Sequence, residues 1–567
     1  MRITLITFFS FFFSLYSNAQ SIQEARKLTD NEQYENASSI YRALLLNNPS
    51  DVSFYYYYGD NLLLSDNADS SKIIFEKGLS IDSTFPLLKI GKAKILLDKI
   101  SEREAKLSSE QDGANKELRD RYELAQTNIK EAEELIAEAT QITKSTNVLI
   151  EGAEAFTHYK NKNTEKAKSF LDKVVLIDPK NKEALLLYGD IYTELNNGSL
   201  AADYYNRALD LDKSSARAIV SKGRLYKRST NYEGAAREFE NAISIEPSYA
   251  PAYRELGETY IKLGKLGPAK EQYKKYLELS KNNCGARIRY ATFLFISKNY
   301  TEALSELNQV QQRCDTNNLT MLRLLSYCYY ETKDTAKGLN TINHLFRLLT
   351  TEKRTGKDLE YYGKFLIVTN RDSSVQNGIE QLQKSFALDP SRTDLLTEMA
   401  MAWSKLKQYP NAIQLLNQKI IIGREVKVID YYTLARAYYF NRQFAEADSA
   451  AKKVNELSPV YASGWVLRAQ ANAHIDSTSE AGLAKPFYEK YIEIAINDST
   501  NPSKYQNGLI EAYGYLAYYY ILKKDNVNGL VYLKKKLNLP LESDDKKNVQ
   551  LAIDQLEGRG PKPKKLN

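Results

Sequence analysis

The sequence is poor in the residues that build catalytic and metal sites. Its 567 residues include three histidines and three cysteines. His158, His344 and His474 lie far apart along the chain, and none has a second ligand at metal-binding spacing. No glycine-rich phosphate loop, nucleophile elbow or catalytic carboxylate pair stands out. We therefore expect no enzymatic activity, no cofactor and no metal ion.

A strong excess of one charge is also missing, and so is a long apolar run beyond residue 20. The formal net charge is +7 and the isoelectric point is near 8.7. For a chain of this length, that balance does not indicate nucleic acid as a partner. A membrane-spanning helix needs about 20 mostly apolar residues in succession. We therefore predict no transmembrane segment, although peripheral association with a membrane stays open.

The first twenty residues have the pattern of a secretory signal peptide. Arg2 gives a positive start, residues 3–15 form an apolar run rich in phenylalanine, and residues 17–20 offer small residues for cleavage. The run is too short to span a membrane, and no cysteine for a lipid anchor lies near the cleavage site. We expect an exported bacterial protein of the periplasm. Association with the outer membrane stays open, and an uncleaved membrane anchor is the alternative.

Three glycines mark a repeat of 34 residues in the middle of the chain. The residues three, twelve and sixteen positions after each glycine are the same or alike in all three copies. The four sets are Gly189, Gly223 and Gly257; Tyr192, Tyr226 and Tyr260; Ala201, Ala235 and Ala269; and Tyr205, Phe239 and Tyr273. Such fixed phase indicates pairs of helices that bury their apolar faces against neighbouring pairs.

This pattern resembles the tetratricopeptide repeat (TPR). The resemblance implies that the small residue lies where the first helix of each pair crosses the second, and that aromatic residues fill the space between pairs. The family's proline after the second helix is matched at Pro49, Pro179, Pro247, Pro390 and Pro459. The phase extends over nearly all of residues 20–545. We predict an all-α fold, a right-handed α–α superhelix (TPR solenoid) of about fourteen helical pairs.

The spacing of the repeats divides the chain into five parts. The signal peptide (1–20) is followed by N-terminal TPR units (21–147), a regular TPR core (148–355), degenerate C-terminal TPR units (356–545) and a basic tail (546–567). Gly91 and Ala132, the small residues of one unit, are about 29 residues further apart than usual. We predict that the excess forms an extended helical hairpin (about 99–130) with a turn near 112–115, either a solvated projection or a docking finger.

The resemblance places the first helix of each pair on the concave face. The register then predicts a protein-binding groove with a basic stretch followed by an apolar one: Arg217, Arg224, Lys227, Arg228, Arg254, Lys262, Ile288, Phe295, Tyr327 and Tyr330. This groove suits an extended peptide with acidic residues at one end. Alternatively, Arg224 and Arg228 pair with Asp190 and Glu194 of the neighbouring unit. The Lys/Asn clamp of chaperone-binding members, which holds a C-terminal carboxylate, is missing.

Two of the three cysteines stand at adjacent ends of one predicted helical pair. Cys284 begins the first helix and Cys314 follows the second. Helix axes lie about 8–10 Å apart and a disulfide needs Cα atoms within about 4.4–6.8 Å, so the loops must bring the residues together. An oxidising periplasm permits the bond. The alternative is three free cysteines; in either case Cys328, inside the next first helix, is expected to be a buried thiol.

These features together predict a noncatalytic protein–protein interaction scaffold or adaptor in the bacterial cell envelope. Its partners would be other proteins or extended peptide segments, in outer-membrane assembly or secretion machinery. One alternative is a SusD-like glycan-binding outer-membrane protein, which usually needs a lipid-anchor cysteine and long irregular insertions. A second alternative is a TPR-bearing glycosyltransferase, but the repeats leave no room in the sequence for its catalytic domain.

Overall fold

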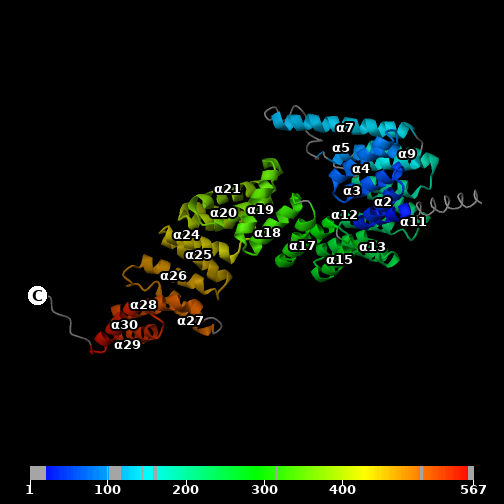
Figure 1. The fold of residues 1–567 in the computed structure, drawn as a ribbon. Helices are drawn as coiled ribbons and strands as arrows, with labels where there is room; N and C mark the ends of the chain where they lie inside the picture. The colour runs from blue at the N-terminus through cyan, green and yellow to red at the C-terminus, as the bar shows by residue number, and fades with distance from the viewer. Residues whose placement is uncertain are drawn as a thin grey trace, which may run out of the picture. The chain divides into compact units, whose positions relative to one another are not determined.

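The computed structural model of the protein is built from α-helices (Figure 1). It describes residues 21–98, 100, 116–142, 145–157, 163–281, 283–314, 316–498 and 502–559. Within those ranges the chain forms helices, turns and loops but no strand. The predicted signal peptide (1–20), the hairpin turn (112–115), His158 and the end of the tail (560–567) lie outside the described residues.

The chain divides into two compact units. Unit 1 covers Met1–Leu324 and unit 2 covers Leu325–Asn567. The division falls inside the helix α18 (Leu319–Glu331), and thus inside the stretch 148–355 that the spacing marks as a regular core.

The helices of unit 1 follow helical residues 21–30. They are α2 (Tyr34–Asn47), α3 (Val52–Leu64), α4 (Ala68–Ile81), α5 (Pro86–Asp98), α7 (Lys116–Ile142), α8 (Thr146–Ala155), α9 (Thr164–Ile177), α10 (Lys182–Glu194), α11 (Gly198–Leu211), α12 (Ala216–Arg228), α13 (Tyr232–Ile245), α14 (Ala250–Lys262), α15 (Leu266–Leu279), α16 (Cys284–Ile296) and α17 (Tyr300–Arg313).

The helices of unit 2 follow α18. They are α19 (Thr335–Leu348), η1 (Thr351–Lys353), α20 (Gly356–Val368), α21 (Asp372–Leu388), α22 (Asp394–Lys405), α23 (Tyr409–Ile422), α24 (Val428–Phe440), α25 (Phe444–Leu457), α26 (Ala462–Ile475), α27 (Lys485–Asn497), η2 (Pro502–Tyr505), α28 (Gln506–Leu522), α29 (Asn526–Leu537) and α30 (Ser543–Leu556).

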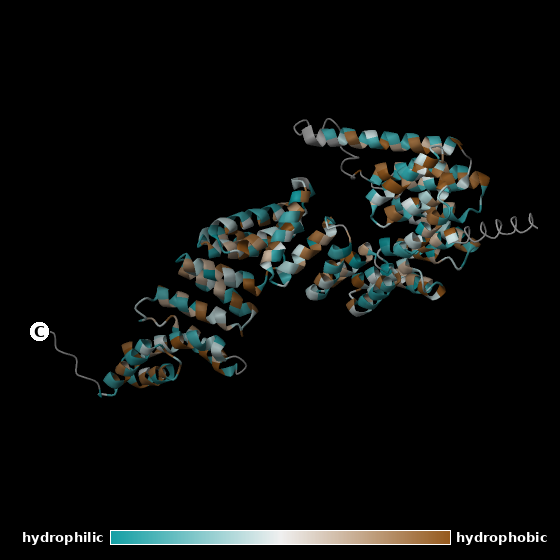
Figure 2. Cartoon of the chain, viewed as in Figure 1, coloured by the Kyte–Doolittle hydropathy of each residue, from teal (hydrophilic) through white to brown (hydrophobic). Residues whose placement is uncertain are grey.

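Successive helices pack as pairs, and the pairs stack along each unit. α12 packs on α13, α14 on α15, and α24 on α25, while the second helix of one pair also contacts the first helix of the next. Apolar and polar residues are interspersed along the helices (Figure 2), as expected when each helix buries one side against its neighbours. The described helices form about fourteen pairs, which confirms the predicted all-α TPR solenoid.

The repeated small and aromatic residues occupy the positions that the TPR register assigns to them. Ala201 and Ala235 are fully buried in the second helices of their pairs. The ring of Phe239 lies directly over Gly223, where the first helix crosses the second. These close backbone approaches explain why glycine or alanine recurs at these positions.

A left-handed residue ends the first helix of each regular pair. Asn196, Thr230, Gly264 and Lys298 follow one another at intervals of 34 residues, and all have φ between 57° and 71°. The residue that follows Thr230, Asn231, then caps the second helix. Its side chain accepts a hydrogen bond from Gly234 N at 3.0 Å. The turn is therefore set by local chemistry that recurs with the repeat.

The predicted extended hairpin (about 99–130) lies partly outside the described residues, which omit residue 99 and residues 101–115. On its N-terminal side α5 ends at Asp98, and Ile100 is buried. On its C-terminal side α7 has 27 residues and packs on α5 (Figure 1). The buried residues of α7, Ala132 and Ile136 among them, join the core of unit 1.

The predicted basic tail begins with a helix, which corrects its boundary. Residues 543–556 form α30, and Val549 and Ile553 are buried against α28 and α29. These two apolar residues stand four positions apart and therefore share one helix face. The Lys- and Asp-rich sequence around them obscured that face, because most of its side chains are exposed.

Candidate functional site

The predicted basic stretch lies on the first helices α12 and α14 of unit 1. We call Arg217, Arg224, Lys227, Arg228, Arg254 and Lys262 the basic face. Most of these cations already have partners within the chain, as the following distances show.

Glu255 is the centre of the basic face. Its carboxylate accepts a hydrogen bond from Arg224 Nε at 2.8 Å and lies 3.0 Å from Arg254 Nη1, and Lys227 also donates to it. The Glu255 side chain is only 4% exposed. Burial by itself raises the pKa of Glu255, but the charges of Arg224, Arg254 and Lys227 outweigh burial and lower it to about 2.

The remaining cations of the basic face differ in their surroundings. Arg217 pairs with Glu183 at 2.5 Å. Arg228 pairs with Glu194 at 3.2 Å, one of the two pairings that the sequence left open. Lys262 is exposed and forms no ion pair with any described residue.

The other pairing that the sequence left open, Arg224 with Asp190, is not formed. Arg224 pairs with Glu255, and Asp190 accepts a hydrogen bond from Tyr205 at 2.7 Å.

The first repeat of unit 1 also contacts the basic face. Glu32 lies in the turn between helical residues 21–30 and α2, with a φ of 55°. Its carboxylate accepts hydrogen bonds from Arg254 Nη2 at 3.0 Å and from the Tyr276 hydroxyl at 2.6 Å. Gln33 Nε2 donates to the Ser248 carbonyl at 3.2 Å. Glu32, which is 222 residues from Arg254 in the sequence, therefore already binds to this face.

Beside these contacts unit 1 has a hollow of about 520 Å³. Asp190, Glu194, Arg224 and Arg228 line it, together with Thr193. Charges of both signs thus meet in one concavity that lies next to the Glu255 cluster. It is large enough for a few side chains of another molecule.

The apolar part of the predicted groove is partly internal, because Ile288 and Tyr327 are buried whereas Phe295 and Tyr330 are half-buried. Ile288 is buried in unit 1, and Phe295 is half-buried with its ring 5.6 Å from that of Tyr300. In unit 2, Tyr327 is 4% exposed; it donates a hydrogen bond to the buried Asp358 at 2.5 Å. Tyr330 packs edge-on against Phe365. The Tyr327 ring therefore fills space inside unit 2 and offers little surface to a peptide, whereas Phe295 and Tyr330 stay partly exposed.

A hollow that the sequence analysis missed lies in unit 2, between the first helices α22 and α24. We call it the basic–aromatic pocket. It has a volume of about 390 Å³, and its lining includes Met401, Lys405, Lys407, Tyr409, Arg436 and Phe440.

The repeat register could have found this pocket. Arg436 directly follows the small residue of its repeat, as Arg224 does in an earlier repeat. Lys405 lies five residues after the small residue of its own repeat, which is the position of Arg228. The degenerate sequence of these repeats hid the correspondence, because alanine replaces glycine in both.

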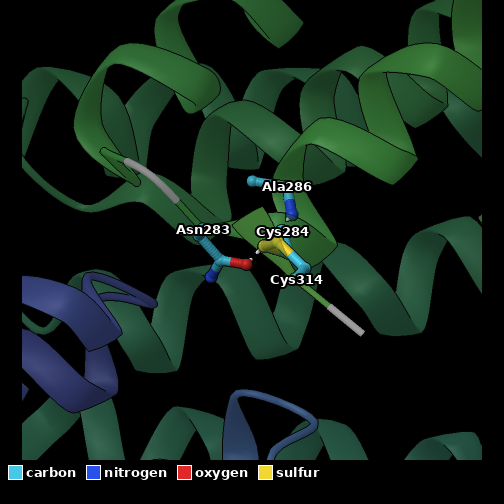
Figure 3. The surroundings of a disulfide bond; sticks show 4 residues. All are labelled: Asn283, Cys284, Ala286 and Cys314. Carbon is cyan, nitrogen blue, oxygen red and sulfur yellow. Dashed lines mark hydrogen bonds between the residues drawn. A yellow bond between two sulfur atoms is a disulfide. The ribbon is translucent and has the colours of Figure 1, made fainter. Parts of the chain in front are cut away.

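Cys284 and Cys314 form a disulfide at the open end of the α16–α17 pair (Figure 3). Their Cα atoms are 6.5 Å apart. Asn283 caps α16 beside the bond by accepting a hydrogen bond from Ala286 N at 3.1 Å. Cys328 is a buried thiol, and burial raises its pKa to about 12.

Two features are absent from the described residues. No three or more His, Cys, Asp or Glu side chains in that part of the chain are grouped so that they could hold a metal ion. None of its helices combines the length and the apolar character needed to cross a membrane.

Known proteins match this chain through its repeats. The family model of the tetratricopeptide repeat protein 21 C-terminal ARM domain matches residues 92–254, and a tetratricopeptide-repeat model matches residues 250–283. No curated protein matches the chain.

Several solved structures are similar. One is the C-terminal part of a TPR repeat-containing protein from Cytophaga hutchinsonii, with 33% identity over 46% of this chain and 98% of that chain and a TM-score of 0.41. Another is the Cut9–Hcn1 hetero-tetramer of the APC/C, with 15% identity, coverage of 74% and 90%, and a TM-score of 0.41. A third is YrrB, described as a TPR protein with an unusual peptide-binding site, with 21% identity, coverage of 31% and 91%, and a TM-score of 0.26.

The family matches and the 34-residue recurrence of glycine, aromatic and left-handed turn residues agree with one another. TPR proteins generally mediate protein–protein interaction. The chain belongs to the tetratricopeptide-repeat proteins.

Proposed function

We propose that this protein is a noncatalytic scaffold of the bacterial cell envelope that binds extended segments of other proteins on the basic face of unit 1. Outer-membrane assembly and secretion machinery are the contexts in which an exported scaffold of this kind would act. The proposal extends the general role of TPR proteins to a particular face and compartment.

The main support for this proposal is the binding of the Glu32 carboxylate by Arg254 and Tyr276. A carboxylate from a distant part of the chain is held there by a guanidinium and a hydroxyl, both as donors. Charge-assisted hydrogen bonds of this kind are stronger than those between neutral groups. The basic face therefore has the chemistry to hold an acidic side chain.

The adjoining hollow of about 520 Å³ supplies room for a partner. Arg224 and Arg228 are each 42% exposed, so their guanidinium groups can still contact another molecule. Asp190 and Glu194 lie on the same wall. A segment that carries both charges would fit this arrangement, with its acidic residue toward Arg228.

Affinity capture from the native host tests the binding role. The full chain carrying a tag would be cross-linked in intact cells, and the captured envelope proteins would be quantified by mass spectrometry. Arg228→Glu reverses a charge in the hollow. Arg237→Glu makes the same change on α13, where Arg237 is exposed outside the hollow, and serves as the matched control.

We expect one or more proteins that are captured by the wild type and by Arg237→Glu but are at least fivefold depleted with Arg228→Glu. Equal capture by all three forms would overturn the role of the basic face. Thermal melting of each variant shows whether a loss of capture merely reflects unfolding.

The compartment is tested separately. The Cys284–Cys314 disulfide supports an oxidising compartment, because such bonds persist in secreted and periplasmic proteins and are rare in the cytosol. Fractionation of the native host should find the protein in the periplasm or with the outer membrane, starting near Ser21 by N-terminal sequencing. Recovery in the cytosol with residue 1 intact would contradict export.

A further inference from the structure

We propose that the basic–aromatic pocket of unit 2 binds an acidic peptide segment that carries an aromatic side chain. This pocket is a different site from the basic face of unit 1. The two proposals therefore succeed or fail independently.

Three cations line the pocket, and no carboxylate does. Lys405, Lys407 and Arg436 are exposed, and none of them forms a salt bridge with any residue that the structure describes. This differs from the basic face of unit 1, where Arg224, Lys227 and Arg254 all reach Glu255. The positive charge of the pocket is therefore available to a ligand.

Two of these cations contact neighbouring groups of the chain. Lys405 Nζ donates a hydrogen bond to the Ile367 carbonyl near the end of α20, at 3.0 Å. The guanidinium of Arg436 lies 5.7 Å from the ring centre of Phe440 and 5.9 Å from that of Tyr432. An arginine held against aromatic rings loses less side-chain freedom when it then binds a carboxylate.

The apolar half of the pocket is exposed as well. Phe440 is 50% exposed and Met401 is 45% exposed. The Phe440 ring stacks on that of Tyr409 with centroids 5.6 Å apart, so one of its faces is supported. Large apolar side chains gathered at a hollow commonly mark an interaction site. A further aromatic ring in the pocket would extend this stack.

Charge and shape together define the ligand. One or two carboxylates would neutralise the cations, while an adjacent aromatic side chain would cover Phe440 and Met401. A volume of about 390 Å³ lies within the usual range for binding pockets, roughly 300–1,000 Å³. Single-stranded nucleic acid, by contrast, needs a basic groove that follows its backbone over several nucleotides. The three cations here surround one hollow, which favours a short acidic peptide segment.

Fluorescence anisotropy with three synthetic peptides tests the proposal on the full mature chain. The probe is fluorescein-labelled Gly-Ser-Asp-Phe-Glu-Ser-Gly with an amidated C-terminus. One comparison peptide has Asn and Gln in place of Asp and Glu, and the other has Ala in place of Phe. A labelled dodecathymidylate strand tests the nucleic-acid alternative.

The variants separate the two halves of the pocket. Arg436→Glu and Lys405→Glu reverse a charge each, Arg436→Lys keeps the charge, and Phe440→Ala removes the exposed ring. Lys452→Glu on α25 makes the same charge change at an exposed position outside the pocket. Circular dichroism melting of every variant confirms that it is folded.

We expect saturable binding of the acidic aromatic peptide, weakened at least tenfold by Arg436→Glu or Lys405→Glu and about threefold or more by Phe440→Ala. Lys452→Glu should bind like the wild type, and Arg436→Lys should retain most of the affinity. Both comparison peptides should bind at least fivefold more weakly. The proposal is overturned by an absence of saturable binding, by equal binding of the uncharged peptide, by equal binding in folded pocket variants, or by tighter pocket-dependent binding of the DNA strand.

Discussion

The ring of Phe239 lies so close to Gly223 that a Cβ atom added to this glycine would stand 2.5 Å from Phe239 Cε1. Real Cβ contacts are never that short, so any side chain at this position must displace the ring or separate the two helices. The 34-residue recurrence of small residues therefore has a steric cause.

Gly223→Leu should destabilise unit 1 by several kcal/mol, because the side chain overpacks the crossing of α12 and α13. The loss should extend over the pairs from the first repeat to α15, because Glu32 and Gln33 link the first repeat to α14 and the loop before it. Chemical denaturation and thermal melting measure it. Gly267→Leu is the control, because an added Cβ there meets nothing within 4 Å. Equal melting of the wild type and Gly223→Leu would rule out this packing.

The disulfide should be detected by thiol titration. Unfolded but unreduced protein should show one free thiol, that of Cys328, and reduced protein should show three. The bond links residues 30 positions apart, so the chain-entropy model gives it about 3–4 kcal/mol of stabilisation. Cys314→Ser should lower stability by about this amount, and a reductant should abolish the difference. Three thiols without reduction would exclude the bond.

Unit 1 should lose stability in acid through Glu255. The pKa of this carboxyl is about 2 in the folded protein and near 4.5 when unfolded. Because the folded pKa is the lower one, the contribution of Glu255 is complete above about pH 4.5 and disappears as the pH falls toward 2. At 1.36 kcal/mol per pKa unit it amounts to about 3 kcal/mol at most.

Glu255→Gln isolates this contribution. The stability difference between wild type and Glu255→Gln, measured by urea denaturation, should be large at pH 6 and should shrink between pH 4.5 and pH 2.5. Glu278→Gln, at an exposed position on α15, should show a small difference that does not change with pH in this way. A pH-independent difference for Glu255→Gln would contradict the lowered pKa.

Lys419→Met should destabilise unit 2 by about 3–5 kcal/mol. Lys419 Nζ lies 2.9 Å from the fully buried carboxylate of Asp430 and 2.8 Å from the Thr397 hydroxyl. Removing the ammonium leaves a buried charge without its partner. Hydrogen exchange should quicken in α22–α25. Adding Asp430→Asn to Lys419→Met should recover part of the loss, whereas exposed Lys452→Met should change stability by less than about 0.5 kcal/mol.

Those features of the fold that depend on neighbouring repeats could be predicted from the sequence. Gly223 and Phe239 lie within one repeat, so their contact follows from the 34-residue phase. The register also allows Arg228 to pair with Glu194 of the adjacent repeat, and the structure contains this pair. Arg224 instead turns toward Glu255 of the following repeat, a choice between two neighbours that the register does not decide.

Other features depend on structure that the register does not contain. Tyr327 was expected in the groove, but Asp358 of α20 provides a buried acceptor for its hydroxyl, and the ring stacks on Tyr361. The contact of Glu32 with Arg254 joins repeats far apart in the sequence. It depends on the accumulated curvature of the repeats between them, which no local pattern reveals.

That contact changes how unit 1 should unfold. In a simple solenoid each repeat is sensitive only to the repeats beside it, and damage at one end fades along the chain. Here Glu32 and Gln33 link the first repeat to α14 and the loop before it. The repeats in between are therefore joined at both ends of the stretch as well as to their neighbours. Unfolding of any repeat in this stretch strains the contacts of Glu32 and Gln33. Removal of the first repeat exposes Arg254 and Tyr276 directly. The stretch from the first repeat to α15 should therefore behave as one cooperative body.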